Sequence, residues 1–209
     1  MSVSSQPNND SVDSVKDSST SEALRHNAHA TGVADSGRWS TKRIAMYALF
    51  VALAMVTSFI EFPLMPGVQW LKYDPSGIVC LVAGFAFGPS AAVIVSVLGF
   101  LPHLFTNPWG TLMAVLVALC LSVPAALVYR GKRTRSRALA GVLVGAVCAL
   151  AAAIVGNLLI TPIYAHMTIA QVAAMIVPVL LPFNLIKFAI HAVVTFAIYK
   201  PVSDLLNRA

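Results

Sequence analysis

Long apolar runs separated by short polar segments make up most of this chain between about Thr41 and Lys200. A run of about 20 apolar residues crosses the roughly 30 Å hydrocarbon core of a bilayer as a helix. Inside that core every backbone polar group needs a partner within the chain, which favours helices. With 58% hydrophobic and 11% charged residues and a mean hydropathy of +0.80, the chain is predicted to be an all-α, polytopic membrane protein.

Six apolar segments are predicted to span the membrane, at about 41–60, 77–87, 90–105, 110–129, 138–164 and 182–200. The second has only eleven residues before Gly88-Pro89, and even counted from Asp74 it rises about 21 Å. Either the membrane thins locally, or the polar loop 61–76 dips into its outer half and lines a cavity; we favour the dipping loop. A partly helical piece, 168–181, is expected before the last span.

Basic residues set the expected orientation of the chain. The segment Arg130-Gly-Lys-Arg-Thr-Arg-Ser-Arg137 carries five positive charges in eight residues, which indicates a cytoplasmic loop. Six spans then place both termini in the cytoplasm. We expect a disordered cytoplasmic tail at 1–40, a six-helix transmembrane domain at 41–200 and a short cytoplasmic tail at 201–209. The formal charge of +6 gathers in connecting segments, which does not suggest a nucleic-acid partner.

The last apolar run carries a line of polar residues. Pro182 is expected to open this helix, because proline suits a first helical turn. Asn184, Lys187, His191 and Thr195 then fall within an arc of about 80°. Such a stripe faces protein or a cavity, because lipid would leave its polar groups unpaired. The lysine and the amide in the first turns predict a ligand site.

Four polar residues are expected to meet at the outer side of the membrane. Asp74 comes from the loop, Asn157 from the fifth span, and Asn184 and Lys187 from the start of the sixth. Each residue has a structural alternative when considered singly. Asp74 could cap the short helix, Asn157 could bridge helices, and Lys187 could extend to the interface. Together these residues favour a ligand pocket.

Motifs for catalysis or metal binding are missing from the sequence. The cysteines lie in apolar runs without CxxC spacing, and the histidines show no HExxH or HxxxH pattern, so neither a disulfide framework nor a metal site is predicted. The sequence contains no GxxxxGKS, so a P-loop ATPase is excluded. Two other classes stay open: a small membrane enzyme that acts through His103 or His191, and a structural membrane protein.

Three alanines form a smooth strip in the first span. Ala45, Ala48 and Ala52 stand at positions i, i+3 and i+7, and small residues at this spacing let another helix approach closely. Alanine is common in every span, so the strip is a hypothesis for partner docking rather than a specific signal.

A succession of short motifs resembles one known family. In order, these are Glu61-Phe-Pro63, Leu71-Lys-Tyr-Asp-Pro-Ser76, Gly84-Phe-Ala-Phe-Gly-Pro89, Asn157 with Pro162-Ile-Tyr164, and Pro182-Phe-Asn-Leu-Ile-Lys187. Together they resemble the riboflavin-specific S component, the substrate-binding subunit, of energy-coupling-factor (ECF) transporters, from about Lys42 to Lys200. The last motif and the Phe-Gly-Pro turn are the most specific parts of the resemblance.

The resemblance implies a fold and an activity. The fold would be the ECF S-component bundle of six helices, with a vitamin pocket near the outer face under the loop after the first helix. The protein would be a non-enzymatic subunit in the plasma membrane that captures riboflavin as a transported ligand and needs no cofactor. Its partners would be a transmembrane coupling subunit and two ATP-binding-cassette ATPases. The alternative cargo is another vitamin or an aromatic precursor.

The resemblance also assigns roles to residues. Asn157, Asn184 and Lys187 would contact the flavin, and Asp74 with its loop would close over it. The flat rings need an aromatic slot, for which the candidates are Trp70, Tyr73 and Tyr164. The strip of Ala45, Ala48 and Ala52 would dock the coupling subunit. With few cations near the pocket, a phosphate-bearing flavin is expected to bind less tightly than the free vitamin.

Overall fold

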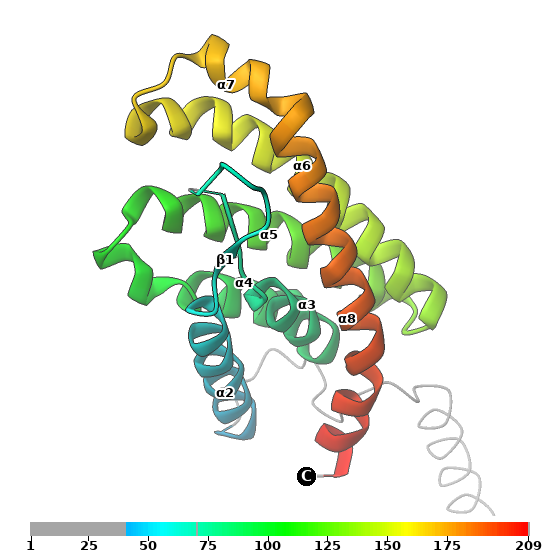
Figure 1. The fold of residues 1–209 in the computed structure, drawn as a ribbon. Coiled ribbons are helices and arrows are strands. Elements are labelled where there is room, and N and C mark those ends of the chain that lie inside the picture. The colour runs from blue at the N-terminus through cyan, green and yellow to red at the C-terminus, as the bar shows by residue number, and fades with distance from the viewer. Residues whose placement is uncertain (1–40, 70, 209) are drawn as a thin grey trace, which may run out of the picture.

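The computed structural model describes residues 41–69 and 71–208, so the predicted tail at 1–40 lies outside the described residues. The described chain is almost entirely helical (Figure 1). Its α-helices are α2 (Thr41–Ser58), α3 (Ser76–Phe87), α4 (Pro89–Leu98), α5 (Pro108–Gly131), α6 (Arg135–Ala165), α7 (Ile169–Met175) and α8 (Leu181–Arg208). A 3₁₀ helix, η1 (Leu101–Phe105), precedes α5, and a π-helical turn, η2 (Ile176–Leu180), precedes α8.

Four helices in the described part of the chain are long and apolar enough to cross a membrane. These are α2, α5, α6 and the stretch Ile176–Tyr199. Two shorter apolar stretches, Ser76–Phe87 and Pro89–Phe105, coincide with the second and third predicted spans. All six predicted apolar segments are therefore helical, and the all-α membrane class is confirmed.

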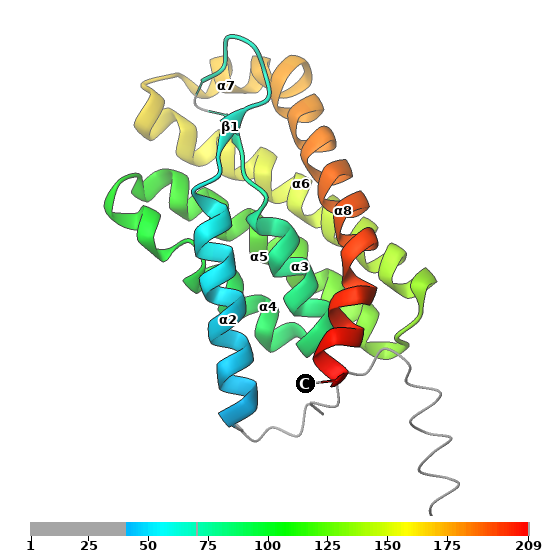
Figure 2. The same ribbon diagram turned by 60° about the horizontal axis from the view of Figure 1, so that its bottom comes forward.

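The short helix α3 occupies the centre of the bundle. All twelve of its residues are buried, and it packs against α2, α4, α5 and α8 (Figure 2). Twelve residues rise only about 18 Å, less than the thickness of a hydrocarbon core. Because protein surrounds α3, its ends meet protein groups rather than acyl chains, and its short length is tolerated.

The third apolar segment is interrupted, although the sequence predicts one continuous helix. Helix α4 stops before Gly99, where an added Cβ would lie 2.7 Å from the Cβ of Ala54 in α2. Pro102 then removes a backbone donor from the next turn, which continues as the 3₁₀ helix η1. The break brings Phe100 and His103 to the cavity described below.

Helices α5 and α6 form the most extensive helix pair (Figure 1). Gly141 of α6 lies so close to α5 that an added Cβ would be 2.6 Å from the carbonyl oxygen of Ala125. The basic loop joins the two helices, and the Thr134 hydroxyl caps α6 by accepting a hydrogen bond from the backbone N–H of Arg137 at 3.3 Å. Long, closely packed helices of this kind give the cavity a rigid side.

Helix α8 follows α7 through the π-helical turn instead of starting freely at Pro182. The partly helical piece predicted at 168–181 is thereby confirmed. Pro182 has no N–H for the carbonyl of Pro178, and its ring crowds the preceding turn, so the helix widens locally. Helix α8 also continues to Arg208, past the boundary predicted at Lys200.

The loop between α2 and α3 contains a short hairpin. Strand β1 (Phe62–Pro63) pairs antiparallel with strand β2 (Lys72–Tyr73), and Phe62 lies opposite Tyr73. Figure 2 shows the hairpin projecting from the bundle beyond the end of α2 and the start of α3. Leu71, Lys72 and Asp74 of this loop line a cavity, which confirms that part of the prediction.

Candidate functional site

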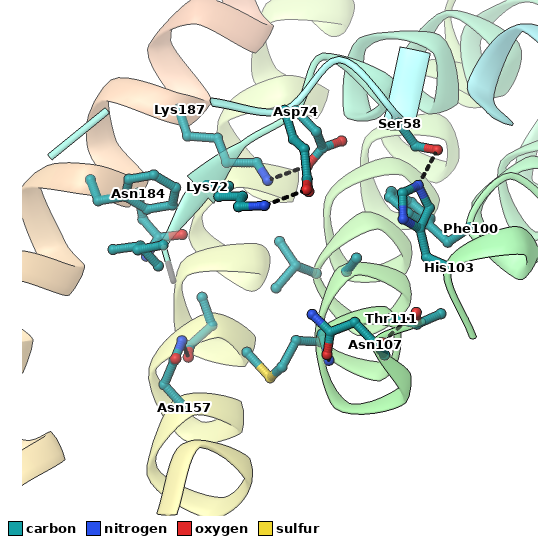
Figure 3. Close-up of a pocket in the computed structure, with 18 of the residues that line it drawn as sticks. Ser58, Lys72, Asp74, Phe100, His103, Asn107, Thr111, Asn157, Asn184 and Lys187 are labelled. Atoms are coloured by element: carbon teal, nitrogen blue, oxygen red, sulfur yellow. Dashed lines mark hydrogen bonds and ion pairs between the residues drawn. The ribbon is translucent and has the colours of Figure 1, made fainter. Parts of the chain in front are cut away.

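A cavity of about 410 Å³ lies among the hairpin loop, η1, α5, α6 and the start of α8. Its volume is within the range of small-molecule sites, roughly 300–1,000 Å³. Figure 3 shows most of its labelled polar side chains on two opposite sides, with Lys72 and Asp74 between them. We call Asn157, Asn184 and Lys187 the amide wall, and Ser58, His103, Asn107 and Thr111 the framing wall.

The amide wall is built by hydrogen bonds within its own helices. Asn157 donates its amide N–H to the carbonyl of Ala153 at 2.7 Å, and its side-chain oxygen accepts from the Thr161 hydroxyl at 2.8 Å. Asn184 donates to the carbonyl of Leu180 at 2.7 Å. Each amide therefore keeps one N–H unused, and the side-chain oxygen of Asn184 has no hydrogen-bond partner in the described part of the chain.

The polar stripe of α8 faces inward, as its spacing predicts. Asn184, His191 and Thr195 are 4%, 1% and 0% exposed, and the side chain of Lys187 is 15% exposed. Only Asn184 and Lys187 reach the cavity. His191 and Thr195 lie further along the helix, packed inside the bundle.

Asp74 enters the cavity from the loop and forms an ion pair with Lys187. The Lys187 Nζ lies 3.0 Å from the Asp74 Oδ2, and both side chains are largely buried. The hydroxyl and the backbone N–H of Ser76 both donate to the other carboxylate oxygen. Burial alone would raise the pKa of Asp74, but the Lys187 ammonium and the Ser76 hydroxyl hold that pKa below its ordinary value.

The framing wall is largely occupied by its own contacts. The hydroxyl of Ser58 lies 2.9 Å from the His103 Nε2. The side-chain oxygen of Asn107 caps α5 by accepting from the N–H of Gly110 at 3.0 Å, and the Thr111 hydroxyl donates to the Asn107 carbonyl at 2.8 Å. These groups fix the junction of η1 and α5.

Aromatic rings complete the cavity. Phe100, Tyr164 and Phe183 line it, whereas Tyr73 does not. The ring of Tyr73 is buried behind the lining, with ring centroids 5.4 Å from Phe62 and 5.5 Å from His191. The other aromatic candidate, Trp70, lies outside the described residues.

A second ion pair lies at the edge of the cavity. Lys72 Nζ is 2.5 Å from Glu61 Oε1, and both side chains are partly exposed. Each of the two lysines that line the cavity is therefore paired with a carboxylate, and the lining aspartate and glutamate balance them. A ligand entering this cavity meets polar groups but little net charge.

Sequence reasoning anticipated the amide wall and missed most of the framing wall. Asp74, Asn157, Tyr164, Asn184 and Lys187 all line the same cavity. The missed lining residues include Ser58, Phe100, Asn107, Thr111 and Phe183. The Asn107-Pro108 pair was a usable signal, because an N-cap residue followed by proline marks a helix start and therefore a place where backbone groups gather.

The alanine strip lies on the exposed side of α2. Ala45, Ala48 and Ala52 are all exposed, whereas Tyr47 and Ala54 are buried against the bundle. The strip is therefore accessible to lipid or to another protein.

Comparison with known proteins gives consistent matches over the helical part of the chain. The family model for "ECF transporter, substrate-specific component" matches residues 42–199. A Staphylococcus aureus protein named riboflavin transporter RibU is 28% identical over 176 residues, covering 80% of this chain and 93% of the relative. A Streptococcus thermophilus protein of the same name is 27% identical over 182 residues, covering 81% and 86%.

A solved structure agrees with the same assignment. It is described as "Structure and mechanism of the S component of a bacterial ECF transporter" and aligns with a TM-score of 0.69 at 26% identity, covering 79% of this chain and 97% of that one. Since the family model covers most of the sequence and the fold matches as well, this chain belongs to the family of substrate-specific S components of ECF transporters.

Proposed function

We propose that this S component binds riboflavin in the cavity and presents it for ATP-driven uptake. The observation that carries the proposal is the meeting of Asn157, Asn184 and Lys187 on one wall of a cavity of about 410 Å³. The names of the two relatives support riboflavin as the cargo. Other vitamins are the competing cargo that the experiment below tests.

Membership of the family fixes the broader role. The chain is a multi-pass protein of the plasma membrane, works with an ECF energising module on a small-molecule substrate, and is a transport protein rather than an enzyme. His103 and His191 therefore need no catalytic role. In the structure, His103 pairs with Ser58 and His191 with the backbone of Asp74.

The chemistry of the amide wall suits a flavin. The polar edge of an isoalloxazine alternates carbonyl oxygens with an N–H, and asparagine amides pair with both kinds of group. The unused N–H groups of Asn157 and Asn184 and the free oxygen of Asn184 supply both. Lys187 would add a charged donor, and Phe100, Tyr164 and Phe183 would contact the flat rings. Asp74 and its loop would close over the ligand, and Tyr73 would support that loop from behind.

We also propose the membrane arrangement and the partners. Six spans with both termini in the cytoplasm fit the figures, in which the start of α2 and the end of α8 lie at the same end of the bundle (Figure 2). The partners would be a transmembrane coupling subunit and two ATP-binding-cassette ATPases. The coupling subunit would dock on Ala45, Ala48 and Ala52, where small side chains permit close helix contact.

Bulky substitutions on the strip test this docking. Ala48→Leu combined with Ala52→Leu is expected to prevent co-purification of the coupling subunit while leaving riboflavin binding unchanged, because the strip lies outside the cavity. Leu53→Phe, at an exposed position of α2 about 100° around the helix from the strip, is the matched control. Normal assembly of the double variant would refute the docking proposal.

Titration of the purified protein tests the cargo. Riboflavin fluorescence is expected to be quenched on binding, with one vitamin bound per chain, and thiamine and biotin should not compete. Riboflavin mononucleotide should bind at least about 10-fold less tightly, because both cavity lysines are already paired and its phosphate would be desolvated without a free cation. Equal affinity for the mononucleotide would refute the charge argument. Absence of riboflavin binding would refute the cargo.

A further inference from the structure

His191 contacts the loop without reaching the cavity. Its imidazole is 1% exposed, one helical turn beyond Lys187 on the same face of α8, and it does not line the cavity. The His191 Nε2 lies 3.2 Å from the backbone carbonyl oxygen of Asp74. A carbonyl can only accept, so the Nε2 carries the hydrogen and donates it. Two side chains of α8 therefore hold Asp74: Lys187 bonds its carboxylate and His191 its backbone.

The imidazole occupies a space that a glycine leaves open. A Cβ added to Gly77 would lie 2.5 Å from the His191 Cε1 and 2.8 Å from its Nδ1. The ring also packs between Tyr73 and Phe188, at centroid distances of 5.5 Å and 6.5 Å. Any larger residue at position 77 would displace the imidazole and break its hydrogen bond to Asp74.

The backbone of Asp74 connects the hairpin loop to the buried core of the bundle. Strand β2 leads directly into Asp74, and the neighbouring residues Leu71 and Lys72 line the cavity. On the other side of Asp74, helix α3 begins at Ser76 and is buried along its whole length. Asp74 is thus the point at which a partly exposed hairpin meets the fixed core.

We propose that His191 is a positioning residue which, acting through the backbone of Asp74, holds the hairpin loop closed and so sets how long the ligand stays bound. This inference rests on the proposed function, because it assumes that the loop closes over a bound ligand. It assigns His191 no contact with that ligand. Loss of the hydrogen bond between His191 and Asp74 is expected to speed ligand dissociation and to change the association rate little.

Two substitutions separate the hydrogen bond from the packing. In His191→Gln the side-chain amide retains an N–H donor at about the reach of the Nε2, whereas His191→Leu fills the space without a donor. Loss of one hydrogen bond corresponds to about a 3- to 10-fold change in an equilibrium or rate. His191→Leu should therefore release riboflavin about 3- to 10-fold faster in stopped-flow fluorescence, with an association rate within about 2-fold of wild type. His191→Gln should restore most of the slow release.

Limited proteolysis of the ligand-free protein gives a second readout. Lys72 lies in the hairpin with its side chain 45% exposed, so tryptic cleavage after Lys72 reports how often the loop opens. His191→Leu should be cleaved about 3- to 10-fold faster than wild type and His191→Gln at nearly the wild-type rate. Cleavage within the basic loop after Arg133, far from His191 in the sequence, is the internal control and should not change.

A double-mutant cycle tests the contact with Gly77. Gly77→Ala should accelerate release and cleavage as His191→Leu does, because the added methyl group displaces the imidazole. In the His191→Ala background the three atoms nearest to the added methyl group are gone, so Gly77→Ala should have no further effect. Additive effects of the two substitutions would contradict the proposed contact.

The outcomes distinguish this proposal from the proposed function. Wild-type release and cleavage rates in a folded His191→Leu variant would overturn the positioning role. Equal acceleration of release and cleavage in His191→Gln and His191→Leu would also overturn it, because it would show that the packing of the imidazole, and not its hydrogen bond, holds the loop. If the wild-type chain does not bind riboflavin, the proposed cargo fails, and the cleavage experiment still decides whether His191 holds the loop.

Discussion

On the amide wall, Asn157 and Asn184 each donate one N–H to a carbonyl in the preceding turn of their own helix, which orients the amide and leaves other polar atoms free. On the framing wall, Asn107 and Thr111 use their polar atoms to build the start of α5, and Ser58 pairs with His103. Under the proposed function, similar chemical groups would therefore serve recognition on one side and architecture on the other. The comparison teaches that lining a cavity does not by itself imply binding the ligand.

The largest effect is expected from Lys187. Lys187→Met removes a charged donor and leaves the Asp74 carboxylate without its partner at a largely buried position, so riboflavin affinity should fall about 100-fold. Lys72→Met is the matched control, because Lys72 also lines the cavity but pairs with Glu61 at the exposed edge. In the control, fluorescence titration should show less than about a 3-fold loss of riboflavin affinity. Equal losses of riboflavin affinity in the two variants would show that the amide wall does not differ from the rest of the lining in ligand binding.

The ion pair that anchors the amide wall should respond to acid. The pKa of Asp74 is below its ordinary value in the folded protein, so the stability it contributes is present above the unfolded pKa of about 4 and is lost as pH falls through the lower folded pKa. Asp74→Asn should therefore lower the unfolding free energy by about 2 kcal/mol at pH 7, and the difference should shrink below about pH 4. Thermal unfolding of both proteins from pH 3 to 7 measures this. A difference that grows on acidification would contradict the assigned charge state.

The two asparagines of the amide wall should have intermediate effects. Asn184→Leu and Asn157→Leu would each remove the proposed hydrogen bonds to the ligand, and each should weaken riboflavin binding about 10-fold. Asn184 should matter more, because its side-chain oxygen is free, whereas that of Asn157 already accepts from Thr161. Titration of both variants under one condition ranks them. The reverse order would show that the existing hydrogen bonds do not predict which amide is available.

The smallest effect is expected on the framing wall. Thr111→Val keeps the shape of the side chain and removes a hydroxyl that already donates to the Asn107 carbonyl. Riboflavin affinity should change less than about 3-fold, whereas the unfolding free energy should fall by about 1 kcal/mol. Calorimetric titration and thermal unfolding of the same sample separate the two quantities. A 10-fold or greater loss of riboflavin affinity would show that Thr111 contributes directly to ligand binding.

Much of this site could be predicted from local sequence, but the framing wall that completes the cavity could not. The spacing of Asn184, Lys187, His191 and Thr195 was sufficient to predict an inward stripe, because helical periodicity is a local property. The framing wall depends on the break near Gly99, where Ala54 of another helix approaches closely and Pro102 follows. A contact between residues so distant in sequence leaves no periodic signal.

The hairpin loop between α2 and α3 was likewise predicted only in part from its sequence. Its polarity and its position before a short apolar segment predicted that it lines a cavity, and Asp74 does so. The sequence also suggested that Tyr73 contacts the ligand, whereas its ring lies behind the lining against His191. Adjacent residues of an extended strand point to opposite sides, and the sequence alone did not say which side faces the cavity.

The visible absorption of the purified protein tests the central claim most directly. Wild-type chain incubated with riboflavin and freed of excess ligand should be yellow and retain about one flavin per chain. The Lys187→Met/Asn184→Leu double variant, with α-helical content equal to wild type, should retain almost none. Full retention by the double variant, or a colourless wild type, would contradict the assignment of the amide wall as the riboflavin-binding surface.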